Sequence, residues 1–127
     1  MAIRKFTVVP VTGTATATAY SPYLSGYIES IEYVKHGVTP YSDGVDLTVT
    51  ADATGESILA LTDMNASVVK RPRAPTHSTA GVAAAYASGG TGVNDRIALA
   101  RDRVKIAIAQ GGNGKTGTFI ITVDDGR

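Results

Sequence analysis

Near the end of the chain, the segment GGNGKT at residues 111–116 has the residue types that bind phosphate groups in many nucleotide hydrolases. The nucleotide-binding loop reads G-x-x-x-x-G-K-[ST], and Gly114, Lys115 and Thr116 supply its second half. The position of the first glycine holds Ala109 instead. A phosphate loop also runs from a strand into a helix, whose N-terminal amide groups hold the anion. The residues after Lys115 alternate as a strand does, so we expect neither a nucleotide cofactor nor an enzyme built on this segment.

We interpret the same residues as a connection between two strands. Apolar and other side chains alternate over 103–109 and again over 118–123, which is typical of strands with one buried face. The pair Asn113-Gly114 lies between them, and Asn-Gly is a strong signal for a tight hairpin because both residues tolerate a positive φ. This pattern predicts a hairpin with Lys115 exposed in its turn.

The histidines offer little for catalysis or metal binding. His36 lies in a turn rich in Gly and Pro, and His77 is followed by Ser78. A catalytic triad of His77 with Asp95 or Asp102 is conceivable, but triads are recognised by geometry and nothing in the spacing supports one.

Metal and thiol chemistry are also unsupported. The carboxylates of Asp43, Asp46 and Asp52 lack the spacing of a calcium-binding loop, so we read them as turn and strand-end residues. The chain has no cysteine, which excludes disulfides and thiolate metal sites. We therefore expect no catalytic residues, metal or cofactor.

Charge and hydropathy restrict the possible partners. The formal net charge of the 127 residues is +1, which argues against nucleic-acid binding by phosphate neutralisation. No stretch approaches the ~20 apolar residues of a membrane span. Pro10 interrupts the short apolar run after the N-terminus, so we assign residues 4–11 to the fold and not to a secretory signal. We expect neither nucleic acid nor membrane as a partner.

Periodicity and turn residues predict an all-β chain forming one domain over residues 1–127. β-branched residues are plentiful, and glycine occurs 14 times. We expect a bulge near Glu29 or Ser30, where the apolar residues fit no single face, and pairing of 65–69 with 57–61. Several short strands with turns at short intervals favour a β-sandwich or barrel. The predicted strands are 5–11, 14–20, 25–34, 45–51, 57–61, 65–69, 103–109 and 118–123.

Residues 70–96 differ from the rest, with many small residues and several glycines. We expect a long connection with one helical turn at most, of a length that is usually functional or ordered by a partner. It begins with a basic cluster, Lys70, Arg71 and Arg73, which is either a contact patch for an acidic partner or ordinary solvated charge. Interface contact and core packing explain equally well the tyrosines at positions 20, 23, 27, 33 and 41.

The chain resembles small structural proteins of tailed bacteriophages from about Ser25 to Val123. The segments SDGVD, PRAPTHSTAG, RVKIAIAQGG and KTGTF carry most of this resemblance. The chain is also similar to capsid cement, or decoration, proteins of short-tailed phages, which adopt antiparallel jelly-roll β-sandwiches and sit as oligomers on the shell. No catalytic motif accompanies either likeness.

The resemblance implies a virion protein that is made in the bacterial host cytoplasm and cements neighbouring major capsid protein subunits from outside. It also implies a homo-oligomer, either a dimer or a trimer. A role as a head–tail connector or tail component is the alternative within the same particle, and a carbohydrate-binding β-sandwich is the alternative outside it. For the cement role we expect residues 1–13 to act as an N-terminal arm that pairs with a partner sheet edge through Phe6 and Val8, beside contacts from the basic cluster.

Overall fold

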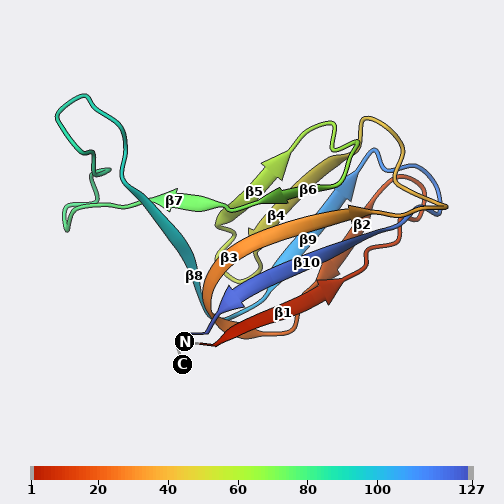
Figure 1. Ribbon diagram of the computed structural model, residues 1–127, viewed down its shortest axis with the longest axis horizontal. Helices are drawn as coiled ribbons and strands as arrows, with labels where there is room; N and C mark the ends of the chain where they lie inside the picture. The colour runs from red at the N-terminus through yellow and green to blue at the C-terminus, as the bar shows by residue number, and fades with distance from the viewer. Residues whose placement is uncertain (1, 126–127) are drawn as a thin grey trace.

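Strands with alternating apolar residues face one another across one core in the computed structural model, which describes residues 2–125 (Figure 1). In β9 the side chains of Val104, Ile106 and Ile108 are buried, while those between them are half-buried on the outer face. The same alternation buries Phe119 and Ile121 in β10. Two apolar faces of this kind bury each other when the sheets stack, which explains the two-layer architecture.

The strands join in two antiparallel sheets. One contains β1, β10, β3, β8 and β7 in that order, with β6 also paired to β3, and the other has the order β2-β9-β4-β5. The strands span Ile3–Val8 (β1), Ala17–Tyr20 (β2), Leu24–Lys35 (β3), Asp46–Ala51 (β4), Ser57–Leu61 (β5), Val68–Lys70 (β6), Arg73–Pro75 (β7), Asn94–Asp102 (β8), Val104–Ala109 (β9) and Gly117–Asp124 (β10).

The strand order is that of a jelly roll. When the short strands β6 and β7 are set aside, the first, eighth, third and sixth of the remaining strands form one sheet, and the second, seventh, fourth and fifth form the other. This alternation between sheets is the double Greek key of jelly-roll sandwiches. The predicted all-β, jelly-roll-like antiparallel sandwich is confirmed. The described residues contain no helix that is long and apolar enough to cross a membrane.

The bulge expected in β3 is also confirmed. Thr122 of β10 pairs with Ser30, but the next residue, Val123, pairs with Ile28. Glu29 is therefore the extra residue, and its insertion lets the apolar side chains on both sides of it face the core.

Two expected pairings were wrong. β9 and β10 do not form a hairpin, because β9 pairs with β2 and β4 while β10 pairs with β1 and β3 in the other sheet. The residues between them cross from one sheet to the other. Residues 65–69 do not pair with 57–61 either, since β6 pairs with β3 and β5 with β4. Alternation shows that a segment has one buried face, and it does not show which strand lies beside it.

Three aromatic rings fill one end of the core. The ring of Tyr33 stacks on Phe119 with centroids 5.1 Å apart and on Tyr41 with centroids 6.1 Å apart. The Tyr41 hydroxyl donates a 2.6 Å hydrogen bond to the backbone oxygen of Pro10, which also accepts a bond from Thr116. Burial raises the pKa of both tyrosines, for Tyr41 far beyond its ordinary value.

These pKa shifts predict alkaline unfolding. As the pH rises, the unfolded chain releases the protons of Tyr33 and Tyr41 first, because their unfolded pKa is about 10 and the folded pKa is higher. The free energy of unfolding should therefore hold up to a pH of about 10 and fall above it. The Tyr41→Phe variant lacks the hydrogen bond to Pro10, so its free energy of unfolding at neutral pH should be lower by about 1 kcal/mol. Between pH about 9 and about 11, however, its free energy of unfolding should fall less than that of the natural chain. Urea unfolding across this pH range tests the slope, and parallel curves for the two proteins would contradict it.

Candidate interaction arm

The GGNGKT segment forms hydrogen bonds with Thr12 of the same chain and leads into a strand. The backbone N–H of Lys115 donates to Thr12 Oγ1 at 2.8 Å, and the carbonyl oxygen of Lys115 accepts from the N–H of Thr12 at 2.8 Å. β10 begins at Gly117, so no helix N-terminus follows the lysine. The segment therefore lacks the anion-binding amide groups of a phosphate loop.

Close packing explains Gly112 in this segment and Gly117 just after it. A Cβ atom on Gly117 would lie 2.6 Å from the ring of Tyr33 and 2.8 Å from that of Tyr41. Gly112 adopts a φ of +82°, in the region that favours glycine, and lies against the side chain of Ser42. The glycines thus allow the chain to pass close to the aromatic end of the core as it crosses between the sheets.

The side chains of two of the candidate residues, His36 and Asp102, accept hydrogen bonds from backbone groups. His36 Nδ1 accepts the backbone N–H groups of Val38 and Thr39 at 3.1 and 3.0 Å and so closes a turn. Asp102 accepts the backbone N–H groups of Ala53 and of its neighbour in the β8–β9 corner. Across the part of the chain that the structure describes, no three His, Asp or Glu side chains gather as a metal site.

Arginine guanidinium groups lie over the rings of the partly exposed tyrosines. The Arg103 guanidinium lies 3.9 Å from the ring centre of Tyr20 and 5.2 Å from that of Tyr23, and its Nε is 2.8 Å from Asp52. The hydrogen bond to Asp52 raises the pKa of Arg103. The cluster ties the end of β2 to the starts of β3 and β9. Of the five tyrosines clustered in the sequence, Tyr33 and Tyr41 are core residues and the other three lie partly exposed, Tyr27 under another arginine.

Residues 76–93 form an arm that projects away from the sandwich between β7 and β8 (Figure 1). Three backbone hydrogen bonds close a ring at its centre: Thr76 donates to Val93, Val93 to Ala84, and Ala84 to Thr76, all at 2.9–3.0 Å. Two small lobes extend from this ring, at 77–83 and 85–92, each closed by its own backbone bonds. The connection expected over 70–96 is therefore shorter, because β7 and the first residues of β8 lie within it, and its backbone groups pair across the arm without a helical turn.

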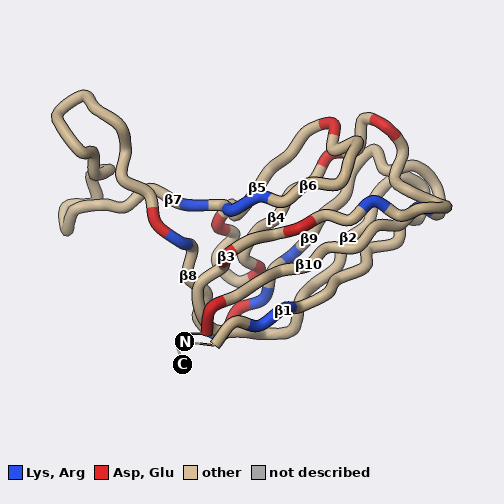
Figure 2. Tube along the Cα trace, in the orientation of Figure 1, with Lys and Arg blue, Asp and Glu red and all other residues tan. Residues whose placement is uncertain are grey.

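The arm carries no Lys, Arg, Asp or Glu, although such residues surround its root (Figure 2). Most of its side chains are small and exposed. Tyr86 is 78% exposed and Val82 is 65% exposed, so the largest apolar groups of the arm lie in solvent. Exposed protein surface normally carries charge, whereas the centre of a protein–protein interface is depleted of it.

An ion-pair network fixes the root of the arm. Arg96, on β8, forms a charge-assisted hydrogen bond with Glu29 and another with Asp124 at 3.0 Å. These bonds, first that to Glu29, raise the pKa of Arg96. Arg96 also covers the ring of Tyr27 at 4.4 Å, and Arg73 on β7 contacts the backbone and carboxylate of Glu29. The bulge residue Glu29 therefore joins both strands of the arm's root to β3.

The structure places the expected partner-contact residues in two regions. Lys70, Arg71 and Arg73 lie exposed beside the root of the arm, and part of the charge of Arg73 faces Glu29. Phe6 and Val8 lie on β1, which pairs with β10 of its own chain, so the residues expected to form a donated arm belong to the sandwich here. Val8 is buried in the core and Phe6 packs against it. Met1, the first residue of that expected arm, lies outside the described residues.

The long connection was expected from the sequence, but its ordered, uncharged tip was not. A run without Lys, Arg, Asp or Glu extends over 76–93, but a longer one, over 6–28, lies in the body, so the run alone does not identify the arm.

Comparison with known proteins supplies no family. No protein family matches the sequence, and no curated protein matches it. Among solved structures, a crystal structure of FLHE is similar to 97% of this chain over 98% of its own, with 10% sequence identity and a TM-score of 0.45. At that identity and score the likeness implies nothing about function.

Gly117→Ala tests the packing explanation of the glycine-rich segment. The added methyl group meets two buried rings, so we expect a loss of about 1–3 kcal/mol in the free energy of unfolding. Gly13→Ala is the matched control, since a Cβ there meets nothing within 4 Å. Urea unfolding measures both, and equal stability of the two variants would refute the explanation.

Glu29→Gln tests the network at the root of the arm. The loss of the negative charge weakens the ion pairs with Arg96 and Arg73, so we expect severalfold faster hydrogen exchange at the amides of Ala74 and Thr76. Exchange at Ile106, in the other sheet, should not change. Glu32→Gln, also on β3, serves as the control, and the same exchange rates in both variants would show that Glu29 does not hold the arm.

Proposed function

We propose that this chain is a structural protein of a bacteriophage particle that binds the outside of the capsid and cements neighbouring major capsid protein subunits. The observation that carries the proposal is the projecting, uncharged arm at residues 76–93 on a jelly-roll body. That the particle is a bacteriophage is inferred from the sequence resemblance to phage structural proteins. Such a protein is made in the host cytoplasm and ends on the capsid surface.

The arm has the surface of a docking element. It lacks charged side chains, so a partner can cover it without desolvating an ion. Its exposed Tyr86 and Val82 can enter pockets, and aromatic residues are enriched at the centre of interfaces. A specific interface usually buries at least ~1,000 Å² in total, about half of it on each partner.

The arm also gains from being covered. Its backbone is ordered by hydrogen bonds, but its small side chains bury little apolar surface against the body. Ordering a chain costs conformational entropy, which burial normally offsets. A partner surface that buries Val82 and Tyr86 would therefore stabilise the arm in the conformation in which it docks.

The division between body and arm suits a cement protein. The jelly roll is rigid, while the arm reaches beyond it to a neighbouring subunit. Display of many copies on one shell lets individually weak contacts hold through effective concentration. A dimer or trimer of this chain would present two or three arms from one body, which extends the same effect.

Replacement of the arm tests the proposal. Residues 77–92 are exchanged for Asn-Gly, which should close β7 and β8 as a two-residue hairpin, because Thr76 already bonds to Val93. The protein is mixed with empty shells assembled from the major capsid protein of the same phage, and co-sedimentation is measured. We expect the natural chain to sediment with the shells and the arm-replaced chain to remain in solution.

Single substitutions separate the docking role from general effects of the exchange. Tyr86→Asp should weaken shell binding at least tenfold, since it places a charge in the interface. Val38→Asp is the control, because Val38 is an equally exposed apolar residue of the body. Equal sedimentation of all these proteins would contradict the docking role of the arm. Binding to tails or connectors in place of shells would replace the cement role with the alternative one.

A further inference from the structure

A second surface lies along β1, the edge strand of the six-stranded sheet. Among the described strands, β1 pairs with β10 alone. The backbone N–H of Asp125 donates a hydrogen bond to the carbonyl oxygen of Ala2. The backbone N–H and C=O groups of every second residue from Ala2 onward therefore point toward β10. The residues between them, Ile3, Lys5 and Thr7, therefore direct their N–H and C=O groups to the free edge. Such a row of backbone groups is a template for another strand.

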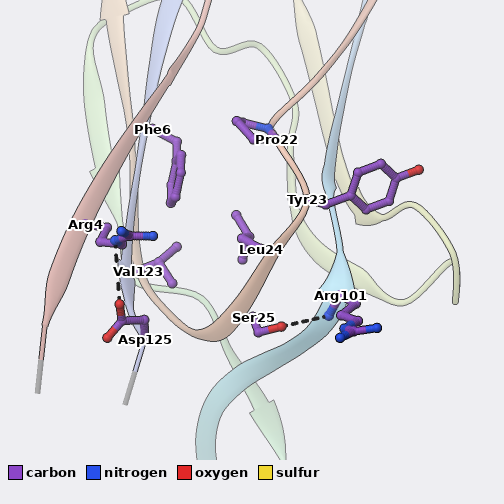
Figure 3. A pocket seen from close by; sticks show the side chains of 9 residues that line it. All are labelled: Arg4, Phe6, Pro22, Tyr23, Leu24, Ser25, Arg101, Val123 and Asp125. Carbon is purple, nitrogen blue, oxygen red and sulfur yellow. Dashed lines mark hydrogen bonds and ion pairs between the residues drawn. The ribbon is translucent and has the colours of Figure 1, made fainter. Parts of the chain in front are cut away.

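A cleft of about 490 Å³ opens beside this edge (Figure 3). The side chains of Phe6 and Val123 face its interior from one side, and those of Pro22 and Leu24 lie opposite them, on the segment that leads into β3. It is large enough for an aliphatic or aromatic side chain. Because inward and outward side chains alternate, a strand laid along β1 would point every second residue toward this cleft.

The charges around the edge are mainly positive. Arg4 is 64% exposed at its side chain and lies at the rim of the cleft, 3.6 Å from Asp125. Lys5 is exposed on the outer face, and Arg101 lies on the far side of the cleft. A second copy of β1 is a poor occupant, because antiparallel pairing centred near Lys5 would place positive residues of the two copies opposite each other.

We propose that the free edge of β1 accepts an extended segment of a partner protein in which aliphatic and acidic residues alternate. Backbone hydrogen bonds to Ile3, Lys5 and Thr7 hold the segment, as in other cases of strand addition. Its aliphatic side chains point into the cleft, and its acidic side chains lie beside Lys5 on the outer face. The edge therefore receives a strand, whereas the sequence-based expectation was that this segment is donated.

A synthetic peptide tests the proposal directly. The probe is a fluorescein-labelled, amidated Val-Glu-Val-Glu-Val-Glu, and its control is the same peptide with Lys in place of Glu. Fluorescence anisotropy measures binding to the full chain, and hydrogen exchange locates it. We expect the acidic peptide to bind at least tenfold more tightly than the basic one and to protect the amides of Ile3, Lys5 and Thr7.

Variants of the edge sharpen the test. Thr7→Pro removes an outward N–H without removing a bond to β10, which is where proline is tolerated in sheets. Lys5→Glu reverses the charge beside the edge, and Lys105→Glu makes the same change on β9 in the other sheet. We expect each of the first two to weaken binding at least tenfold, with Lys105→Glu unchanged. Thermal unfolding establishes that each variant is folded.

Several outcomes would overturn the proposal. They are the absence of binding at millimolar peptide, the same affinity in all variants, and protection at amides away from β1. Protection of the β1 amides that grows with protein concentration without peptide would identify a second copy as the occupant instead. The arm-replaced chain should bind the peptide as the natural chain does, so this result is independent of shell binding.

Discussion

The fold depends on the close passage of a glycine-rich chain past a stack of three buried rings. Tyr33 stacks between Tyr41 and Phe119 at one end of the core. Gly117 passes close to the two tyrosine rings, where a side chain would not fit. This passage takes the chain from β9 in one sheet to β10 in the other. A side chain at position 117 would have to displace the rings of Tyr33 and Tyr41, so the passage restricts which residues can connect the two sheets.

Alternation of side chains was enough to predict the strands with the clearest patterns. The segments that became β4, β9 and β10 each bury every second residue, so their sequence reports their environment. The bulge at Glu29 was visible for the same reason, as a change of phase in one strand. Strand partners were not predictable in this way. Asn113-Gly114 is a good hairpin signal, but the rings that require Gly117 come from positions 33 and 41, far away in the sequence.

The arm illustrates a different limit. Its small residues and glycines permit helix, turn or extended structure, so propensity alone decides little between 76 and 93. The observed form depends on backbone bonds between Thr76, Ala84 and Val93, which no local pattern encodes. The absence of charge, in contrast, is plain in the sequence and does not depend on conformation. It gains meaning only together with the projection of the arm, because residues 6–28 lack charge as well and lie in the body.

The position of the arm explains how the body tolerates it. The arm, with β6 and β7, occupies the single connection between β5 and β8, so the eight strands of the jelly roll keep their order around it. Arg96 and Glu29 then fix its root on β3, near the middle of the six-stranded sheet. The two outer strands of that same sheet are β7, at the root of the arm, and β1, which has the free edge. The two proposed contact surfaces therefore lie at opposite edges of one sheet, and the proposed cement role requires one body to bind two neighbours in this way.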